Sequence, residues 1–184
     1  MNKKIGFIVG SLRKDSFNLK IAKTFANILP EGYEADFIEI GDLPLYNEDL
    51  EVEGKVPESW TRFREQTKAV DGVFFFTPEY NRSVPAALKN ALDVGSRPYG
   101  DSAWDEKPAL VVSVSPGAVS GFGANHHLRQ SLVFLNMPVL QQPEAYIGNV
   151  MNLMNEDGTF IEDTQTFFKL IIDKYVEFFE KLTK

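Results

Sequence analysis

The sequence predicts an α/β fold in which a parallel β-sheet is covered by helices on both faces. Three runs, residues 5–9, 73–76 and 109–114, are short, almost entirely apolar and closed by a turn signal. Strands that lack a polar alternation are typical of a sheet that is buried on both sides. Amphipathic helical patterns lie between these runs, and an alternation of strand and helix is typical of parallel sheets.

Two further strands complete the predicted sheet. Residues 35–40 form the second strand, with Phe37 and Ile38 at its centre. A short fifth strand is predicted near residues 139–140, and it extends toward Tyr146.

Five helices are predicted from apolar residues at helical spacing. They cover residues 17–29, the stretch marked by Trp60, Phe63 and Val70, residues 84–92, residues 128–135 and residues 164–182. Pro85 falls in the first turn of the third helix, where a proline removes no donor that the helix needs.

Five strands in a chain of 184 residues favour a flavodoxin-like three-layer sandwich with the strand order 2-1-3-4-5. The Rossmann-type order is the alternative. We expect residues 1–184 to form a single domain, because the length suits one core and no linker or internal repeat interrupts the pattern.

Charge and cysteine content exclude several function classes. The net charge of -7 argues against nucleic-acid partners and against docking on an anionic membrane, since both require a basic face. The absence of cysteine excludes disulfides, a thiolate nucleophile and a thiolate metal site. The apolar start of the chain ends at Gly10, too early for a signal peptide. We therefore expect a soluble cytoplasmic protein.

Three unusual loops follow the first, third and fourth strands. They read GSLRKDSFN (10–18), TPEYNRS (77–83) and SPGAVSGFG (115–123). In this fold, ligands bind beyond the carboxyl ends of the strands, where the strand order reverses. The three loops are therefore predicted to converge on one crevice.

The first of these loops is suited to an anion, because it opens a helix whose N–H groups favour a phosphate. Ser11, Ser16 and Asn18 add neutral hydrogen bonds, and Arg13 adds a charged one. The alternative interpretation is an ordinary strand-to-helix turn in which Ser16 is the N-cap.

Other phosphate sites do not match this loop. The sequence has neither G-x-x-x-x-G-K-[ST] nor G-x-G-x-x-G here, and it has no cysteine for a phosphatase of the cysteine type. A phospho-acceptor domain would need acidic residues where Gly10 and Ser11 stand. A monophosphate attached to a larger molecule is what these exclusions leave.

The second and third loops are suited to a flat ring. The proline of TPEYN is followed by polar backbone groups that can lie along a heterocycle, which Tyr80 can partly cover. The small residues of SPGAVSGFG let a ring approach the backbone. A phosphate at one end and a planar polar ring at the other describe FMN. Taken alone, Glu79 and Tyr80 would also suit a solvent-facing turn.

These residues carry a resemblance to a known family. The chain resembles the NADPH-dependent FMN reductase family, in its flavodoxin-like branch of quinone, chromate and azo-dye reductases. The matching segments are GSLRKDSFN, DLPLYNEDLE (42–51), TPEYNRSVPAALKNALD (77–93), SRP (96–98) and HLRQSLVFL (127–135). They extend over about residues 3–148.

The resemblance implies non-covalently bound FMN and a set of residues that hold it. The phosphate positions are Ser11, Arg13, Ser16 and Asn18; the loop along the ring is Pro78, Glu79, Tyr80 and Asn81; and Ser115 and Gly117 complete the site.

The resemblance also implies the chemistry. NADPH or NADH reduces FMN by hydride transfer to flavin N5, so the protein supplies no catalytic residue of its own. The reduced flavin then passes two electrons to a small-molecule acceptor: a quinone, an azo dye, chromate or a free flavin. Arg82 is the candidate to bind a phosphate of the nicotinamide nucleotide. The alternative is a flavodoxin-type carrier of single electrons, and the G-S-L-R pattern favours the enzyme.

Family resemblance further predicts a homodimer or homotetramer, with Arg97 and Glu144 at positions used in such interfaces. Two departures concern these contacts and the substrate preference, not the phosphate loop: Val94 replaces an aromatic residue, and His126 replaces a frequent tyrosine. No metal site is expected. His126 and His127 are adjacent, so on a helix they point about 100° apart, which favours a structural or interface role.

Overall fold

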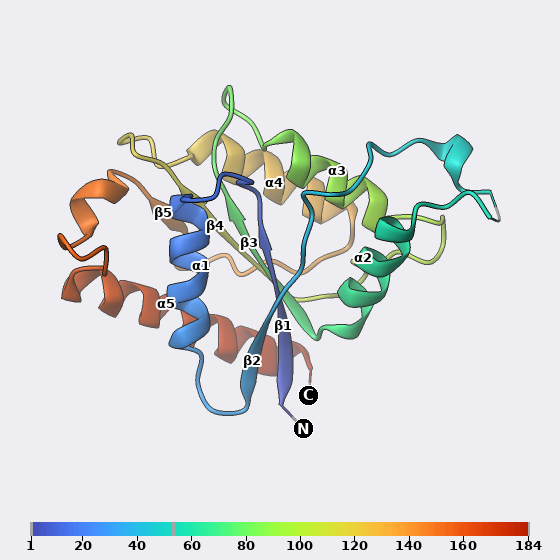
Figure 1. Ribbon diagram of the computed structural model, residues 1–184. Helices are drawn as coiled ribbons and strands as arrows, with labels where there is room; N and C mark the ends of the chain where they lie inside the picture. Colours follow the sequence, from blue (N-terminus) through green and yellow to red (C-terminus); the bar gives the residue numbers. More distant parts are fainter. Residues whose placement is uncertain (1, 53, 184) are drawn as a thin grey trace.

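The protein folds around a five-stranded parallel sheet with the strand order β2-β1-β3-β4-β5, which confirms the predicted flavodoxin-like order (Figure 1). The computed structural model describes residues 2–52 and 54–183. The strands are β1 (Lys3–Val9), β2 (Tyr33–Phe37), β3 (Gly72–Thr77), β4 (Ala109–Val114) and β5 (Ala145–Ile147). The helices are α1 (Phe17–Asn27), α2 (Glu58–Ala69), α3 (Ala86–Gly95), α4 (Phe122–Phe134) and α5 (Glu162–Leu182), with short 3-10 helices at Glu48–Leu50 and Val150–Leu153.

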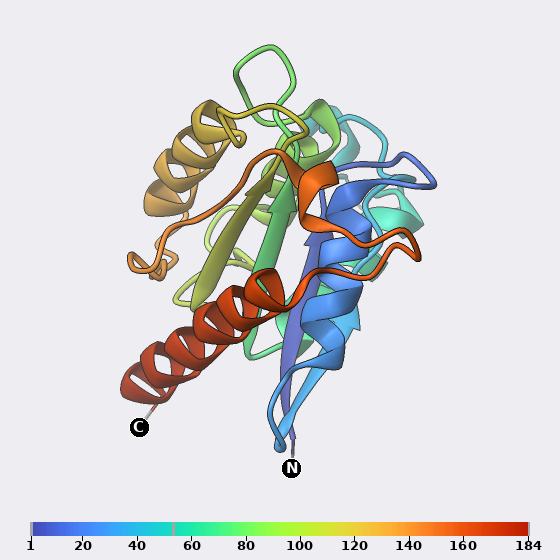
Figure 2. The same ribbon diagram turned by 90° about the vertical axis from the view of Figure 1, so that its left-hand side faces the viewer.

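Both faces of the sheet are buried, as the apolar runs predicted. Phe74 and Phe76 of β3 pack with α1 and α5 on one face. Val73 and Phe75 of the same strand pack with α2, α3 and α4 on the other. Figure 2 shows α1 and α5 on the opposite side of the sheet from α4. Side chains of a strand alternate between faces, so two separate cores require a strand that is apolar at every position.

The second strand ends earlier than predicted. The expected strand 35–40 is β2, Tyr33–Phe37, which pairs with β1 up to Phe37 opposite Phe7. The N–H of Ile38 still donates to the carbonyl of Phe7 (3.0 Å), and beyond it the chain leaves the sheet. Ile38 and Ile40 pack in the core beneath α2 and α3. In the sequence, these buried isoleucines could not be distinguished from strand residues, because both are apolar.

The fifth strand was predicted too early in the chain. Residues 139–140 do not form it: Val139 makes only an isolated bridge to Ala109. β5 is Ala145–Ile147, and it pairs with Val112–Val114 of β4. Pro138 and Pro143 flank this stretch, and proline cannot donate to a ladder, which accounts for the delayed pairing.

The helices are those predicted, with shifted ends. The largest shift is in α4, which begins at Phe122 rather than at residue 128 because Gly121, with a φ of 72°, turns the chain into it. Pro85 precedes α3 as its N-cap. Among the described residues, no helix is both long enough and apolar enough to cross a membrane.

Asn90 of α3 anchors the long connection between β2 and α2. Its Nδ2 donates to the carbonyl oxygens of Leu43 (3.1 Å) and Pro44 (3.0 Å), and its Oδ1 accepts from the N–H of Tyr46 (2.8 Å). The indole N–H of Trp60 donates to Pro44 as well (3.0 Å). These bonds join the segment 42–51 to α3 and fix its path over the sheet edge.

Candidate functional site

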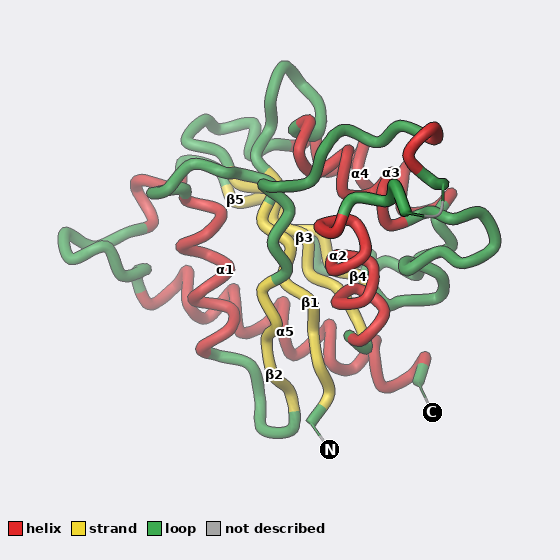
Figure 3. Tube along the Cα trace, turned by 45° about the vertical axis from the view of Figure 1, so that its right-hand side comes forward, coloured by secondary structure: helices red, strands yellow, loops and turns green. Residues whose placement is uncertain are grey.

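The predicted crevice exists where β1, β3 and β4 end. Figure 3 shows the loops, in green, gathered over this edge of the sheet. A cavity of about 180 Å³ lies there, formed by the first, second and third loops. It is lined by Ser11, Arg13, Ser16, Phe17, Asn18, Pro78, Glu79, Tyr80, Val114, Ser115 and Pro116. The structure thus brings most of the predicted residues together, and it leaves Asn81, Arg82 and Gly117 outside the lining.

The start of α1 presents free backbone donors to this cavity. Ser16 is the N-cap, and its Oγ accepts a hydrogen bond from the N–H of Leu19 (3.0 Å). The N–H groups of Phe17 and Asn18 have no partner within the described part of the chain. The capping interpretation is therefore correct, and it leaves two N–H groups at the positive end of the helix dipole for an anion.

Arg13 adds a cation beside these donors. Its guanidinium lies 5.6 Å from the ring centroid of Phe17, a cation–π contact that holds the side chain near the helix start. Arg13 forms no ion pair with any carboxylate of residues 2–52 or 54–183. Phe17 was not predicted as a site residue, although its position directly after the N-cap was the available signal.

Asn18 carries an unsatisfied buried oxygen. The residue is 4% exposed, lines the cavity, and its Oδ1 has no hydrogen-bond partner. A buried acceptor without a donor is costly unless a ligand or water supplies one. FMN offers a phosphate for the free N–H groups and several ribityl hydroxyls that can donate to such an oxygen. The residues present therefore fit FMN.

The cavity volume agrees with partial enclosure of this cofactor. Pockets that enclose a whole drug-sized ligand have volumes of roughly 300–1,000 Å³. A cavity of about 180 Å³ is suited to the phosphate end and part of the chain that follows it. The half-exposed Tyr80 is among the residues that line the cavity.

The second loop is a tight hairpin. The N–H of Tyr80 donates to the carbonyl of Ser83, and the N–H of Ser83 donates to the carbonyl of Tyr80, both at 3.0 Å. Asn81 and Arg82 between them have φ values of 50° and 66°. Two consecutive positive φ angles define a type I′ turn, which places both side chains at an exposed tip. The tip projects at the top of Figure 1.

Glu79 joins this hairpin to α4. Its side chain is 11% exposed, and its Oε2 accepts from the N–H of Ala124 in the first turn of α4 (3.1 Å). Its Oε1 accepts from Nη1 of Arg82 (3.2 Å). A carboxylate is favourable at a helix N-terminus because it pairs with free N–H groups and the helix dipole. Sequence reasoning placed Glu79 along the ring but did not reveal this partner.

A buried polar network supports the third loop. Ser113 Oγ donates to the carbonyl of Ser120 (2.8 Å) and accepts from Nδ2 of Asn125 (3.3 Å). Ser115 Oγ accepts from the N–H of Gly117 (3.0 Å). At Gly117, a Cβ would meet only Ser115 Oγ, at 3.5 Å, so space is open beside the backbone there. Asn125, which is fully buried, was missed by the sequence analysis.

The two histidines contact different elements. His127 Nδ1 lies 3.0 Å from Ser83 Oγ at the end of the hairpin. His126 Nε2 lies 3.0 Å from the hydroxyl of Tyr146 on β5. Burial, together with a hydrogen bond from the hydroxyl to Glu144, raises the pKa of Tyr146 to about 12. These contacts suit the structural role expected for both histidines.

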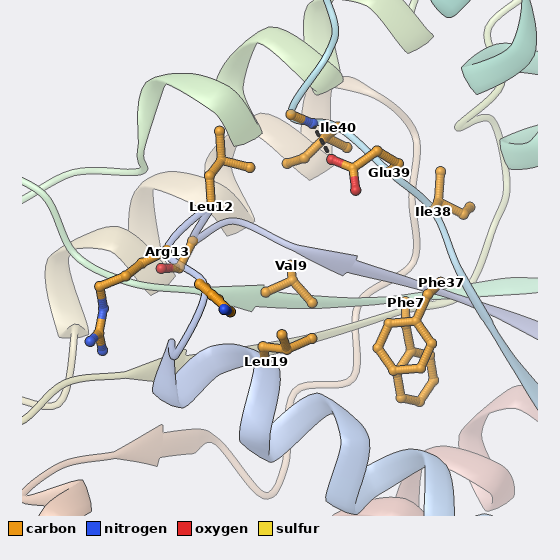
Figure 4. Close-up of a pocket in the computed structure, with 12 residues that line it drawn as sticks. Phe7, Val9, Leu12, Arg13, Leu19, Phe37, Ile38, Glu39 and Ile40 are labelled. Carbon is orange, nitrogen blue, oxygen red and sulfur yellow. Dashed lines mark hydrogen bonds between the residues drawn. The ribbon is translucent and has the colours of Figure 1, made fainter.

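A second cavity lies on the other side of the first loop (Figure 4). Its volume is about 370 Å³, and Ser11 and Arg13 line both cavities. Phe7 and Phe37 lie side by side at one end of it, with ring centroids 5.3 Å apart. The dashed line in Figure 4 is the bond from the N–H of Gly41 to Glu39 Oε1 (2.6 Å). Ile38, Glu39 and Ile40 line this cavity, and because they were predicted to belong to the second strand, the sequence analysis did not reveal it.

Comparison with known families identifies the family of this chain. A family model described as NADPH-dependent FMN reductase matches residues 3–152. The chain belongs to this family. The match covers all three loops and the anchored segment 42–51, which confirms the resemblance. Together with the relatives described below, the match shows that the protein is an enzyme. Its cofactor is FMN, and its electron donor is a nicotinamide nucleotide.

Individual relatives extend over nearly the whole FMN reductase chain. A quinone reductase of Pseudomonas putida is 56% identical over 171 residues, which cover 93% of this chain and 91% of the relative. A 2-hydroxy-1,4-benzoquinone reductase of Burkholderia sp is 41% identical over 173 residues, 94% of this chain and 93% of the relative. The solved structure of a flavoenzyme NAD(P)H:(acceptor) oxidoreductase from Paracoccus denitrificans matches with a TM-score of 0.90 and 38% identity, over 97% of this chain and 98% of that one.

Proposed function

We propose that this FMN reductase carries two electrons at a time from NAD(P)H through FMN to a quinone. One observation supports it most: the free N–H groups of Phe17 and Asn18, with Arg13 beside them, line a cavity at the carboxyl edge of the sheet. That arrangement fits the phosphate of FMN. The names of two relatives, a quinone reductase and a 2-hydroxy-1,4-benzoquinone reductase, support the choice of acceptor.

The proposed roles follow the three loops. Ser11, Arg13, Ser16 and Asn18 hold the phosphate and the adjoining chain. Pro78, Glu79, Tyr80 and Asn81 lie along the ring, and Ser115 and Gly117 complete the opposite side. FMN, when bound, supplies the hydride chemistry.

The protein's task is to bind and orient rather than to react. Buried neutral partners such as Ser16 and Asn18 orient the phosphate end without moving a proton. The exposed tip leaves Arg82 accessible to a phosphate of the incoming nucleotide. The open space beside Gly117 leaves room for a flat ring.

Steady-state kinetics tests this function. The rate is measured while NADPH and 1,4-benzoquinone are varied in turn, and then with chromate, an azo dye or free FMN as the acceptor. We expect parallel double-reciprocal lines, because donor and acceptor use the same exposed ring face in turn. We also expect the highest kcat/KM for the quinone, with slower reduction of the other acceptors. Intersecting lines, or a clear preference for chromate or azo dyes, would contradict the proposal.

We also propose that the enzyme is a homodimer or homotetramer in the cytoplasm. Phe134 and Val133 on the outer face of α4 are 88% and 74% exposed, and Tyr99 is 93% exposed. Large apolar side chains that are exposed to this extent favour association with another protein surface. Arg97 and Glu144 form no ion pair among the described residues, although Glu144 Oε1 accepts from the hydroxyl of Tyr146, so the charges of both can still pair with a second copy. Light scattering on the purified protein gives the oligomeric state.

A further inference from the structure

Glu79 divides its carboxylate between two unequal partners. Oε2 accepts from the backbone of Ala124 (3.1 Å), a fixed donor in the first turn of α4. Oε1 accepts from Arg82 (3.2 Å), whose side chain is 75% exposed, whereas that of Glu79 is 11% exposed. One oxygen is thus committed to the fold, and the other holds a side chain that is free to move.

The backbone beneath this pair is fixed. The two hydrogen bonds between Tyr80 and Ser83 close the hairpin, and His127 contacts Ser83 from α4 (3.0 Å). The hairpin also packs closely on α4, since a Cβ at Gly123 would lie 2.7 Å from the carbonyl oxygen of Arg82. A change of partner at Arg82 therefore requires only rotation of its own side chain.

Charge makes this arginine important for an anionic ligand. The molecule carries a net charge of -7, which repels a dinucleotide. Arg82 is the only cation in the sequence of the second and third loops, TPEYNRS and SPGAVSGFG. Arg13 and Lys14 belong to the first loop, where the phosphate of FMN is proposed to bind. A phosphate of the nicotinamide nucleotide that reaches the hairpin thus meets Arg82 already paired with Glu79.

We propose that Glu79 holds Arg82 in the nucleotide-free enzyme and that a phosphate of NAD(P)H replaces Glu79 as the partner of Arg82. This inference rests on the proposed function. Glu79 is then a positioning residue that keeps Arg82 at the site. It also weakens nucleotide binding, because the ion pair between Glu79 and Arg82 must break before the phosphate can bind. Because Arg82 is well exposed, the strength of that pair is small, equivalent to about a two- to fivefold change in affinity.

The variant Glu79→Gln tests the exchange. The glutamine oxygen can still accept from Ala124, while its amide group faces Arg82 with a donor and releases it. Binding of NADP⁺ to the FMN-loaded protein is measured by calorimetry, which avoids any contribution from turnover. We expect E79Q to bind NADP⁺ about two- to fivefold more tightly than the original protein. Unchanged or weaker binding would overturn the proposal.

Three further variants, D93N, R82Q and E79Q/R82Q, show whether the effect of E79Q acts through Arg82 or only through the change in net charge. Asp93→Asn removes another exposed carboxylate, paired with Lys89 at 2.7 Å on α3, and raises the net charge by the same amount as E79Q. We expect no change in NADP⁺ binding for D93N. The double variant E79Q/R82Q should bind NADP⁺ as R82Q does, because the benefit of E79Q acts through Arg82. Additive effects of the two substitutions would contradict the exchange.

A comparison of NADP⁺ with NAD⁺ identifies the phosphate. If Arg82 binds the pyrophosphate, E79Q tightens both nucleotides; if it binds the 2′-phosphate, only NADP⁺ changes. Failure of the proposed function gives a different result, since the original protein would then bind no FMN, or would bind FMN without being reduced by NADPH. An enzyme that passes those tests and shows no effect of E79Q refutes this inference alone.

Discussion

Ser16 has a structural role as the N-cap of α1 and a proposed functional role at the phosphate of FMN. Its Oγ caps α1 by accepting from Leu19, and the residue is only 2% exposed beside the cavity. The same geometry that stabilises the helix leaves the neighbouring N–H groups free for a phosphate. The two roles can be tested separately. A helix cap needs only a hydrogen-bond acceptor, which can be charged, whereas a negatively charged side chain at this position would repel a phosphate.

Two substitutions at Ser16 make this separation. Ser16→Ala removes the cap and should lower the free energy of unfolding of the FMN-free protein by about 0.5–2 kcal/mol, measured by urea denaturation. Ser16→Asp keeps a capping acceptor, so its stability should stay close to that of the original protein. Its charge should weaken FMN binding about tenfold or more, measured by flavin fluorescence. FMN binding by S16D as tight as that of the original protein would place the phosphate elsewhere.

Among the elements, the connection from β2 to α2 depends on one side chain. Asn90 makes three hydrogen bonds to this segment and is 7% exposed. Asn90→Ala should therefore lower the free energy of unfolding by about 2–4 kcal/mol, since it leaves the carbonyl oxygen of Leu43 and the N–H of Tyr46 unsatisfied, while Pro44 keeps its bond from Trp60. Asn27→Ala is the matched control, at an exposed asparagine whose side chain makes no hydrogen bond to the described residues. A loss for N90A no larger than that for N27A would show that the segment is held by other contacts.

The junction of β5 with α4 predicts a pH dependence. The pKa of Tyr146 is raised from 10.0 to about 12 by burial and by its hydrogen bond to Glu144. Between those values the unfolded chain has lost this proton while the native state retains it, so stability falls as pH rises. The contribution of Tyr146 is fully present below about pH 10. Tyr146→Phe should show a smaller loss of stability than the original protein between pH 10 and 12 in urea denaturation; equal losses would contradict the assignment.

The elements also show where the sequence was informative. β1, β3 and β4 were predicted because each contains a run of buried apolar residues that shows no polar alternation. The edges of the sheet were harder to predict, because β2 has no fully buried residue and β5 is only three residues long. Ile38 and Ile40 read as strand residues, yet they pack outside the sheet. The sequence predicted that these two residues are buried, but it did not predict where the hydrogen-bonded pairing of β2 with β1 ends.

At the scale of the whole molecule, the site was located by topology. Three loops distant in sequence were assigned to one crevice because parallel strands end at the same edge. What the sequence did not reveal are contacts between those loops, such as Glu79 with Ala124 or Asn125 with Ser113. Each joins residues that only the packed fold brings together, and no local pattern encodes the partner.

The central claim is that this fold binds FMN and passes electrons from NAD(P)H in pairs. The most direct measurement is the absorption spectrum of the purified protein, with identification of any flavin released on denaturation and anaerobic addition of NADPH to the same sample. We predict an FMN spectrum that bleaches directly to the two-electron reduced form. FMN that NADPH does not bleach would favour a single-electron carrier, and a colourless protein that fails to bind added FMN would contradict the account of the site.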